Sequence, residues 1–293
     1  MLYIKVPAST SNLGSGFDAF GLSLELYNHF YVDFGDRYVV EIEGYGGELP
    51  RDEKNLFIRA YRRACETFGL KEEPITLKQI NQIPTARGLG SSATAIVGGI
   101  VSCIKLHSLR VQLEDVLKVA FEFEPHPDNL LPALLGGFVV CAVEDGRVSY
   151  LKLNFPEELS VVLCIPQFEL STEKARAVLR RDVPLSDAVF NLQRSALLVG
   201  ALLSRRFDLL KEAVKDRLHQ PYRSHLVPGF HRVVERAYEA GALAVFLSGA
   251  GPTVAGFSFD GEEVGKAMTQ AFQEEGIKAE YMVLDVSYEG AYP

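Results

Sequence analysis

Two glycines and two serines stand together in the stretch Gly88-Leu89-Gly90-Ser91-Ser92, which leads into a segment rich in small apolar residues. Glycine lets the backbone turn tightly and bring amide N–H groups close to a ligand. Ser91 or Ser92 stands where the N-cap of a following helix is expected, at the positive end of the helix dipole. The pattern predicts a phosphate-binding loop from which a serine hydroxyl could also reach Mg²⁺. The alternative is a glycine turn that only caps a core helix.

A second group of polar residues lies near the start of the chain, in the glycine-rich turn 8–18. Asn12 and Asp18 flank a pair of glycines there. An aspartate in such a turn is suited to pair with an ammonium group. The alternative is that both side chains only satisfy amides of a connecting turn.

Acidic residues form a third group at the end of the predicted helix 113–124. Glu122 and Glu124 precede the run Pro125-His126-Pro127-Asp128-Asn129. Carboxylates at a helix C-terminus oppose the helix dipole, so they need another reason to be there. A magnesium ion bound to phosphate groups, with one serine hydroxyl and one carboxylate as protein ligands, would supply that reason. The alternative is that they are solvated charges.

Arginines in the second half of the chain form a fourth group. Thr172 and Arg176 lie four residues apart on one face of a predicted helix, where an arginine can fork onto a carboxylate. Arg223 belongs to a compact polar turn that begins at His219. The alternatives are a plain helix cap in the first case and a surface corner in the second.

The hydrophobic pattern predicts the elements that must position these residues. Strands are expected at 2–6, within 22–43, at 75–83, twice within 138–153, and at 159–165, 243–247, 253–259 and 279–285. Helices are expected at 55–68, 92–106, 113–124, 185–205, 207–217, 230–240 and 261–275. The second half then reads β-α-β-β-α-β with extra helices before its second strand, which is typical of a ferredoxin-like domain. The class is α+β, with a domain boundary near residue 155.

Composition restricts the function further. The 293 residues have a formal net charge of −8, which disfavours nucleic acid or an anionic membrane as a partner. No signal peptide and no membrane-spanning run is visible. The four cysteines are scattered, which fits reduced thiols in a cytoplasmic protein better than disulfides or a metal site.

The motif Pro-x-x-x-Gly-Leu-Gly-Ser-Ser-Ala, which begins at Pro84, resembles the nucleotide-binding motif of the GHMP small-molecule kinases. The stretch 248–253 is similar to the third motif of these kinases. The resemblance implies a two-domain fold, with an N-terminal ATP-binding α/β domain at 1–155 and a C-terminal ferredoxin-like domain at 156–293. It implies that ATP is bound by Asn55, Pro84, Thr85, Ala86, Arg87, Gly88, Leu89, Gly90, Ser91, Ser92, Ala93 and Thr94.

Three stretches resemble the homoserine kinases in particular: Asn12 with Asp18, residues 126–129, and residues 218–223. This resemblance implies ATP- and Mg²⁺-dependent phosphorylation of the hydroxyl of L-homoserine to O-phospho-L-homoserine, a step of threonine biosynthesis. It implies substrate binding by Asn12, Asp18, His126, Thr172, Arg176 and Arg223, metal binding by Ser92 and Glu124 with Glu122 in reserve, and catalysis by Ser92, Glu124, Asp128 and Asn129. Homoserine kinases usually have Glu-Gly where this chain has Glu124-Pro125.

Two other functions stay open. A sister kinase of another small alcohol such as mevalonate would leave Asp18 without an ammonium partner. A non-catalytic sensor that binds nucleotide and sugar would not need the serines and the magnesium carboxylate. Oligomeric state is also open, and a homodimer is compatible with the sequence.

Overall fold

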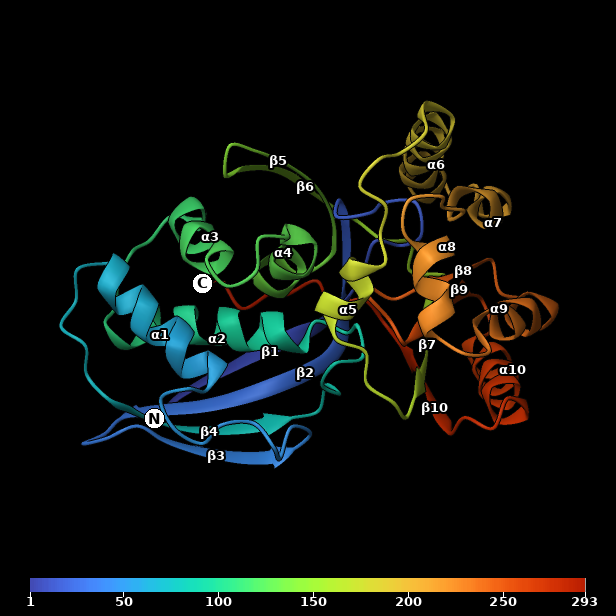
Figure 1. Ribbon diagram of the computed structural model, residues 1–293. Coiled ribbons are helices and arrows are strands. Elements are labelled where there is room, and N and C mark those ends of the chain that lie inside the picture. Colours follow the sequence, from blue (N-terminus) through green and yellow to red (C-terminus); the bar gives the residue numbers. More distant parts are fainter. Residues whose placement is uncertain (293) are drawn as a thin grey trace.

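The computed structural model describes residues 1–292 as two α/β halves that lie side by side (Figure 1). The first half contains a six-stranded sheet in the order β3-β4-β2-β5-β6, with β1 paired to β2. Its strands are β1 (Leu2–Ser11), β2 (Phe20–Phe34), β3 (Val39–Gly44), β4 (Ile75–Asn81), β5 (Phe138–Glu144) and β6 (Arg147–Leu153). The β3–β4 pair is parallel and the other pairs are antiparallel.

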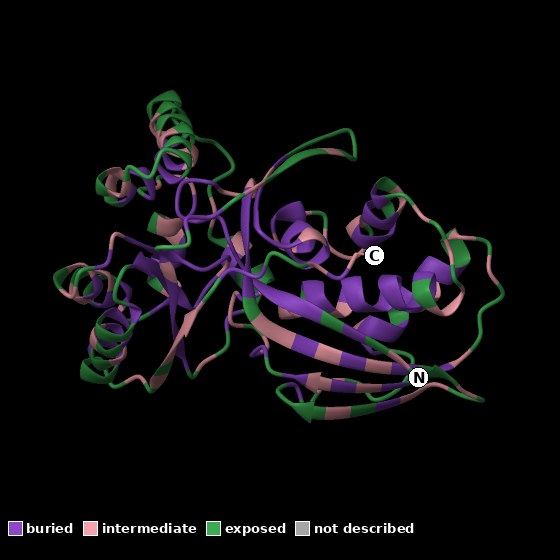
Figure 2. Ribbon diagram, turned by 180° about the vertical axis from the view of Figure 1, so that it is seen from behind, coloured by how far each residue is buried: buried purple, intermediate pink, exposed green. Residues whose placement is uncertain are grey.

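The helices of the first half are α1 (Leu56–Thr67), α2 (Ser91–Leu106), α3 (Leu113–Phe121) and α4 (Pro127–Leu135), and they lie over one face of this sheet (Figure 1). Helix α2 lies at the centre, and from Ile96 to Ile104 every one of its residues is buried (Figure 2). Because Gly98 and Gly99 of α2 carry no side chains, neighbouring elements approach it closely. A Cβ at Gly99 would stand 2.3 Å from the carbonyl oxygen of Phe57. The helix that follows the glycine loop is therefore held rigidly.

The second half contains a four-stranded antiparallel sheet in the order β10-β7-β9-β8. Its strands are β7 (Ser160–Pro166), β8 (Ala244–Leu247), β9 (Val254–Ser258) and β10 (Ala279–Leu284). Its helical elements are α5 (Thr172–Ala177), α6 (Leu185–Leu203), η1 (Phe207–Leu209), α7 (Leu210–Ala213), α8 (Gln220–Arg223), η2 (Ser224–Leu226), α9 (Phe230–Glu239) and α10 (Gly261–Glu274). This strand order is the predicted ferredoxin-like arrangement.

One apolar core joins the two halves. It packs Leu22 and Phe138 of the first sheet against Leu163 and Phe257 of the second. The C-terminal segment returns to the first half, where the Ala291 amide donates to the Ala133 carbonyl oxygen at 2.9 Å. The boundary near residue 155 stays a prediction.

Three predicted elements differ from the structure. The first strand does not end at Pro7 but shifts register between Pro7 and Ala8 and continues to Ser11. The proline is tolerated because β1 pairs only with β2 and is therefore an edge strand, in which a missing N–H leaves no hydrogen bond broken. The region after residue 121 contains a helix, α4, where none was expected, because Pro125 and Pro127 indicate a fixed turn. Pro127 is at the first position of α4, where its missing N–H costs nothing.

The predicted helix 207–217 is broken into η1 and the single turn α7, and the polar turn at 219–223 contains the short helix α8. Within residues 1–292, none of the helices combines the length and the apolar character that crossing a membrane requires.

Candidate active site

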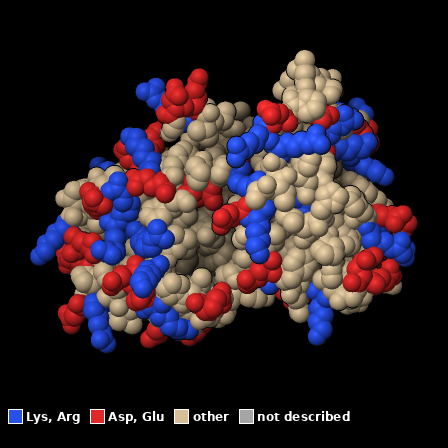
Figure 3. Space-filling view, in the orientation of Figure 1, with Lys and Arg blue, Asp and Glu red and all other residues tan. Residues whose placement is uncertain are grey.

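A cleft of about 500 Å³ lies between the two halves, and the molecular surface is hollowed there (Figure 3). The first half contributes the turn after β1, the start of α1, the glycine loop and the start of α4. The second half contributes residues 169–172, Arg176, Arg223 and the loop at Gly249. All predicted site residues except Thr94 and the reserve carboxylate Glu122 line this cleft. Thr94 is buried. Its hydroxyl donates to the Ser91 carbonyl oxygen and accepts from the side-chain amide of Asn28.

The glycine loop forms one wall of the cleft. Gly90, with φ +74°, is the N-cap of α2, so the expectation of a serine N-cap was wrong. Gly88 also has φ +74°, and a Cβ there would stand 2.2 Å from the Ser248 carbonyl oxygen. Among the hydrogen bonds within residues 1–292, none satisfies the backbone N–H groups from Gly88 to Ala93. The loop thus presents free amides at the positive end of a helix, which is an anion-binding arrangement.

The far end of the cleft is lined by residues that the sequence analysis missed: Glu48, Leu49, Pro50, Lys54, Gln79 and Asn81. Asn55 lies beside them and acts as the N-cap of α1, since its Oδ1 accepts from the Phe57 amide at 3.0 Å. Its Nδ2 donates to the Pro50 carbonyl oxygen at 2.9 Å. Asn55 therefore caps α1 and also borders the cleft.

At the opposite end, Asp18 and Arg176 form a two-pronged ion pair, with Oδ1–Nη2 at 2.8 Å and Oδ2–Nη1 at 3.2 Å. Asn12 positions Asp18, because its Oδ1 accepts from the Asp18 amide at 2.9 Å. Its Nδ2 donates to the Gly249 carbonyl oxygen at 3.0 Å. Asn12 and Asp18 both have positive φ, 68° and 56°, a conformation that Asn and Asp tolerate better than most residues. A carboxylate and a guanidinium thus stand together in the cleft, each able to bind an opposite charge.

A second guanidinium lies beside this pair. Arg223 is 1% exposed and donates to the carbonyl oxygens of Ala175 and Gly249, both at 3.1 Å. Burial and the nearby Arg176 lower the pKa of Arg223 to about 10. The Phe17 ring lies 5.6 Å from the Arg176 guanidinium and 5.1 Å from that of Arg223. Two guanidinium groups thus face one carboxylate of the ion pair, and either can bind an anion such as a carboxylate.

Of the two predicted magnesium carboxylates, only Glu124 lines the cleft. Its Oε1 lies 2.5 Å from Nδ1 of His126, and this contact raises the pKa of His126. Glu122 forms a forked ion pair with Arg63 instead, with Oε2–Nε at 2.6 Å. That pair lowers the pKa of Glu122. Glu122 is paired with Arg63 on the outer surface and does not line the cleft, so it is not placed to serve as a reserve ligand.

Asp128 and Asn129 begin α4 at the floor of the cleft. Asp128 is 4% exposed, and its Oδ1 has no hydrogen-bond partner among the described residues. Burial and the charge of Asp18 raise the pKa of Asp128 to about 6. Asn129 is held by two hydrogen bonds: its Oδ1 accepts from Ser9 Oγ at 2.8 Å, and its Nδ2 donates to Ser11 Oγ at 3.1 Å. One N–H of the amide and one lone pair of the oxygen stay available.

The chain that forms this cleft is similar to known proteins over almost its whole length. The family model "GHMP kinases N terminal domain" matches residues 55–137, and "GHMP kinases C terminal" matches residues 198–278. The chain is 53% identical over 292 residues to a homoserine kinase of Aquifex aeolicus, covering 99% of this chain and 98% of the relative. It is 50% identical over 292 residues to a homoserine kinase of Persephonella marina, covering 99% and 97%. The chain belongs to the homoserine kinases of the GHMP kinase family.

Solved structures agree with this membership. The crystal structure of homoserine kinase from Cytophaga hutchinsonii is 32% identical, with a TM-score of 0.89 over 98% of this chain and 96% of that one. A putative homoserine kinase from Listeria monocytogenes is 33% identical, with a TM-score of 0.80 over 99% and 98%. A mevalonate kinase at 12% identity and TM-score 0.71 shares the fold. The predicted two-domain GHMP kinase fold is confirmed.

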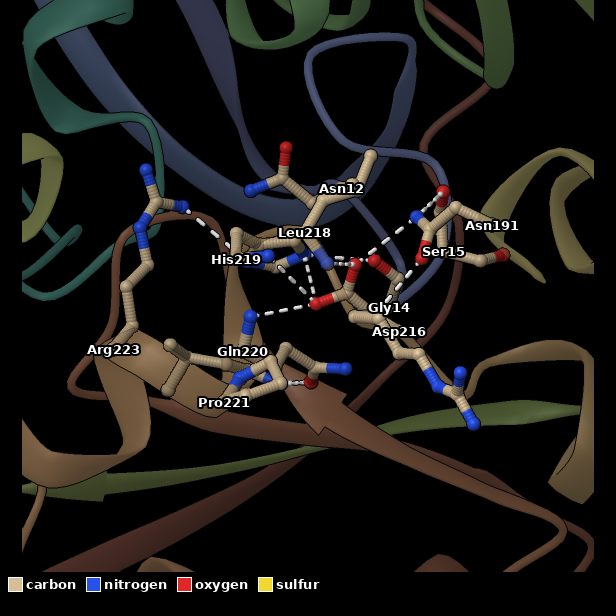
Figure 4. A network of polar contacts seen from close by, with 12 residues as sticks. Asn12, Gly14, Ser15, Asn191, Asp216, Leu218, His219, Gln220, Pro221 and Arg223 are labelled. Carbon is tan, nitrogen blue, oxygen red and sulfur yellow. Dashed lines mark hydrogen bonds and ion pairs between the residues drawn. The ribbon is translucent and has the colours of Figure 1, made fainter. Parts of the chain in front are cut away.

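In this GHMP kinase, a buried network below the cleft fixes Arg223 (Figure 4). Asp216 accepts from the amides of Leu218, His219 and Gln220 at 2.8, 3.0 and 2.6 Å, and thereby caps α8, which carries Arg223. Asn191 donates to Asp216 at 3.0 Å and to the Ser15 carbonyl oxygen at 3.0 Å. The network ties the turn after β1, α6 and α8 into one unit.

His219 belongs to the same network, and burial lowers its pKa. The neutral ring donates from Nε2 to the Gly14 carbonyl oxygen at 2.7 Å, which leaves Nδ1 to accept from Arg223 Nη1 at 3.5 Å. The sequence analysis missed Asp216 and Asn191. The available signal for Asp216 was an aspartate four residues before a helix with proline in its first turn. Asn191 gave none.

Proposed function

We propose that this chain transfers the γ-phosphoryl group of ATP to the side-chain hydroxyl of L-homoserine. The observation that carries the proposal is the position of the Asp18–Arg176 pair with Arg223 in the same cleft as the free amides of the glycine loop. A phosphate chain on the loop and an amino acid at the paired charges would then meet over Asp128 and Asn129. Homoserine carries the ammonium and the carboxylate that these charges can bind.

The substrate would bind by exchange of ion pairs. Its ammonium replaces Arg176 as the partner of Asp18, while its carboxylate is bound by Arg176 and Arg223. Thr172 and His126 lie in the wall beside these groups. Phosphoryl transfer depends mainly on positioning and charge stabilisation, so no strong general base is required. Asp128 and Asn129 would position the hydroxyl.

The residues present also fit a magnesium ion. No group of three or more His, Cys, Asp or Glu side chains within residues 1–292 is arranged as a metal site. A cation would therefore depend on the nucleotide phosphates for most of its ligands, with Ser92 and Glu124 as protein donors, and this is how Mg²⁺ is commonly held. When bound, Mg²⁺ neutralises charge on the phosphate groups.

The reaction places the chain in threonine biosynthesis, and we expect it in the cytoplasm. All four cysteines are free and buried, which is compatible with a reducing compartment.

A coupled assay of ADP release tests the proposal. The purified chain is given ATP and Mg²⁺ with L-homoserine, mevalonate or galactose in turn. Turnover with homoserine that exceeds turnover with the other two alcohols by several orders of magnitude is the expected result. Preference for mevalonate would indicate a sister kinase, and no turnover with any of the three would indicate a sensor. Either outcome overturns the proposal.

A further inference from the structure

Two of the four cysteines lie together, although they are 38 positions apart in the chain. The Sγ atoms of Cys65 in α1 and Cys103 in α2 are 3.4 Å apart, and both residues are fully buried. The other two cysteines have no such neighbour among the described residues: the Cys141 thiol donates to a backbone carbonyl oxygen, and the Cys164 thiol contacts a threonine hydroxyl. Cys65 and Cys103 therefore form a thiol pair, for which the proposed function has no use.

The packing of α1 on α2 brings the two sulfur atoms together. The helices lie side by side (Figure 1) and approach closely at Gly99, where an added Cβ would stand 2.9 Å from the Tyr61 amide nitrogen. Cys103 follows Gly99 by four residues, and Cys65 follows Tyr61 by four, so each cysteine lies one turn further along the same face of its helix. A disulfide requires two backbones that approach each other closely, and this contact provides them.

The two thiols of the pair differ in acidity. Contact with the Cys103 thiol lowers the pKa of Cys65. The same contact, together with burial, raises the pKa of Cys103. Because the thiolate is the reactive form of cysteine, Cys65 is suited to react first with an oxidant, and Cys103 is placed to react with the product.

The position of the thiol pair in its helices determines which oxidants reach it. Cys65 and Cys103 both lie in the last turn, since α1 ends at Thr67 and α2 ends at Leu106. Helix ends open locally at a lower cost in free energy than the centre of a core. A small oxidant therefore reaches the buried pair during such openings, whereas a bulky thiol reagent should not react with the native protein.

We infer that hydrogen peroxide converts the thiol pair to a Cys65–Cys103 disulfide, which fastens α1 to α2. The Cys65 thiolate attacks one peroxide oxygen and the O–O bond breaks; the hydroxide that leaves takes up the thiol proton and becomes water. The Cys103 thiol then attacks the sulfenic acid, and a second water leaves as the S–S bond forms. Two thiols and one peroxide thus give one disulfide and two waters. Neither thiol lines the cleft, so the inference is independent of the proposed function.

The new bond would close a loop that contains β4 and the glycine loop. A disulfide stabilises a protein mainly by restricting its unfolded chain, and a loop of this size should raise the midpoint of thermal unfolding by roughly 5–10 °C. In a reducing compartment the pair stays as two thiols, and the stabilisation appears only after oxidation.

Thiol counting by mass spectrometry tests the inference. The reduced full chain is treated with hydrogen peroxide in slight molar excess while the temperature is raised stepwise below the unfolding transition, and the remaining thiols are then alkylated in denaturant. Four alkyl groups are expected before oxidation and two after it, with the loss of two hydrogen atoms and a cross-linked peptide that joins residues 65 and 103. The oxidised protein should unfold at the higher temperature, and a reducing agent should reverse the shift.

Variants identify the two sulfur atoms. Cys65→Ala and Cys103→Ala should each abolish both the cross-link and the shift in unfolding temperature. The matched control is Cys164→Ala, at an equally buried cysteine outside the pair, and it should still form the bond. Four alkyl groups after oxidation, added oxygen atoms in place of a disulfide, a bond to Cys141 or Cys164, or an unchanged unfolding temperature would each overturn the inference.

Discussion

Asp18 and Arg176, 158 positions apart in the chain, form a two-pronged ion pair in the cleft at 2.8 and 3.2 Å. Both side chains are about 30% exposed, so an incoming ligand can reach each of them. A zwitterion satisfies both charges at once when it enters between them, whereas a ligand of one sign leaves one charge without a partner. Under the proposed function, this pair would select amino acids among small alcohols.

Replacing Asp18 with Asn should raise the KM for homoserine by roughly ten- to a hundredfold and leave the KM for ATP nearly unchanged. The reason is the loss of a hydrogen bond between charged groups, which contributes about 1.5–3 kcal/mol. Steady-state kinetics with each substrate varied in turn measures the effect. An analogue of homoserine without the amino group provides the control, since its weak turnover should not respond to Asp18→Asn. An equal loss for both compounds would contradict ammonium binding.

Replacing Arg223 with Leu should also raise the KM for homoserine far more than that for ATP, by about tenfold or more, because a charged hydrogen bond to the carboxylate is lost. It should lower thermal stability as well, since the carbonyl oxygens of Ala175 and Gly249 lose their donor. Arg223→Lys cannot form the same fork and should recover only part of the binding. Arg180→Leu, at an exposed arginine near Tyr222, is the matched control and should leave both KM values unchanged.

The local parts of this site could be predicted from the sequence. Three parts of the site each bring their chemical groups together within a few positions of the sequence, so their chemistry could be recognised from it. They are the glycine loop, the polar turn at Asn12 and Asp18, and the acidic residues before α4. The sequence could not show that Asp18 forms an ion pair with Arg176 of the same chain instead of standing unpaired for a charged ligand. Such a relationship depends on the packing of the two halves, not on spacing along the chain.

Other features lacked any local signal. Helix α4 was missed because proline is a helix breaker in most positions, although Pro127 fits the first turn. Asn191 lies in the middle of a predicted helix, and its role appears only where α6 packs against the turn at Ser15. The sequence could not show that Glu122 lies outside the cleft, because this depends on its ion pair with Arg63, which is 59 residues from Glu122 in the chain.

Glu124→Gln should lower turnover at limiting magnesium by about tenfold or more and raise the Mg²⁺ concentration for half-maximal activity, because one metal donor loses its charge. Ser92→Ala should act in the same direction. Glu122→Gln is the matched control two residues away; it breaks only an exposed ion pair with Arg63 and should leave the magnesium dependence unchanged. Titration of activity with Mg²⁺ at fixed ATP measures all three variants. A larger effect at Glu122 than at Glu124 would reverse the assignment.

Gly88→Ala should weaken ATP binding and destabilise the fold. The new Cβ would lie 2.2 Å from a backbone oxygen of Ser248, so either the loop or the 248–251 turn must move. Gly146→Ala separates this clash from backbone strain, since Gly146 has a similar φ of +75° but no atom within 4 Å of an added Cβ. Strain alone costs about 1–2 kcal/mol. Differential scanning calorimetry and the KM for ATP should show a larger loss for Gly88→Ala; equal losses would mean that the close approach is unimportant.

Asp128→Asn should stabilise the protein at pH 8 and have a clearly smaller effect at pH 4.5. Burial and Asp18 raise the pKa of Asp128 from 3.8 to about 6 in the folded state. The native protein therefore binds this proton more tightly than the unfolded chain, and the free energy of unfolding falls as pH rises from about 4 to about 6. Two pKa units correspond to about 3 kcal/mol, which the neutral amide should recover above pH 6. Calorimetry at the two pH values measures the difference, with exposed Asp182→Asn as the control. A gain of the same size at both pH values would show that the buried charge is not its source.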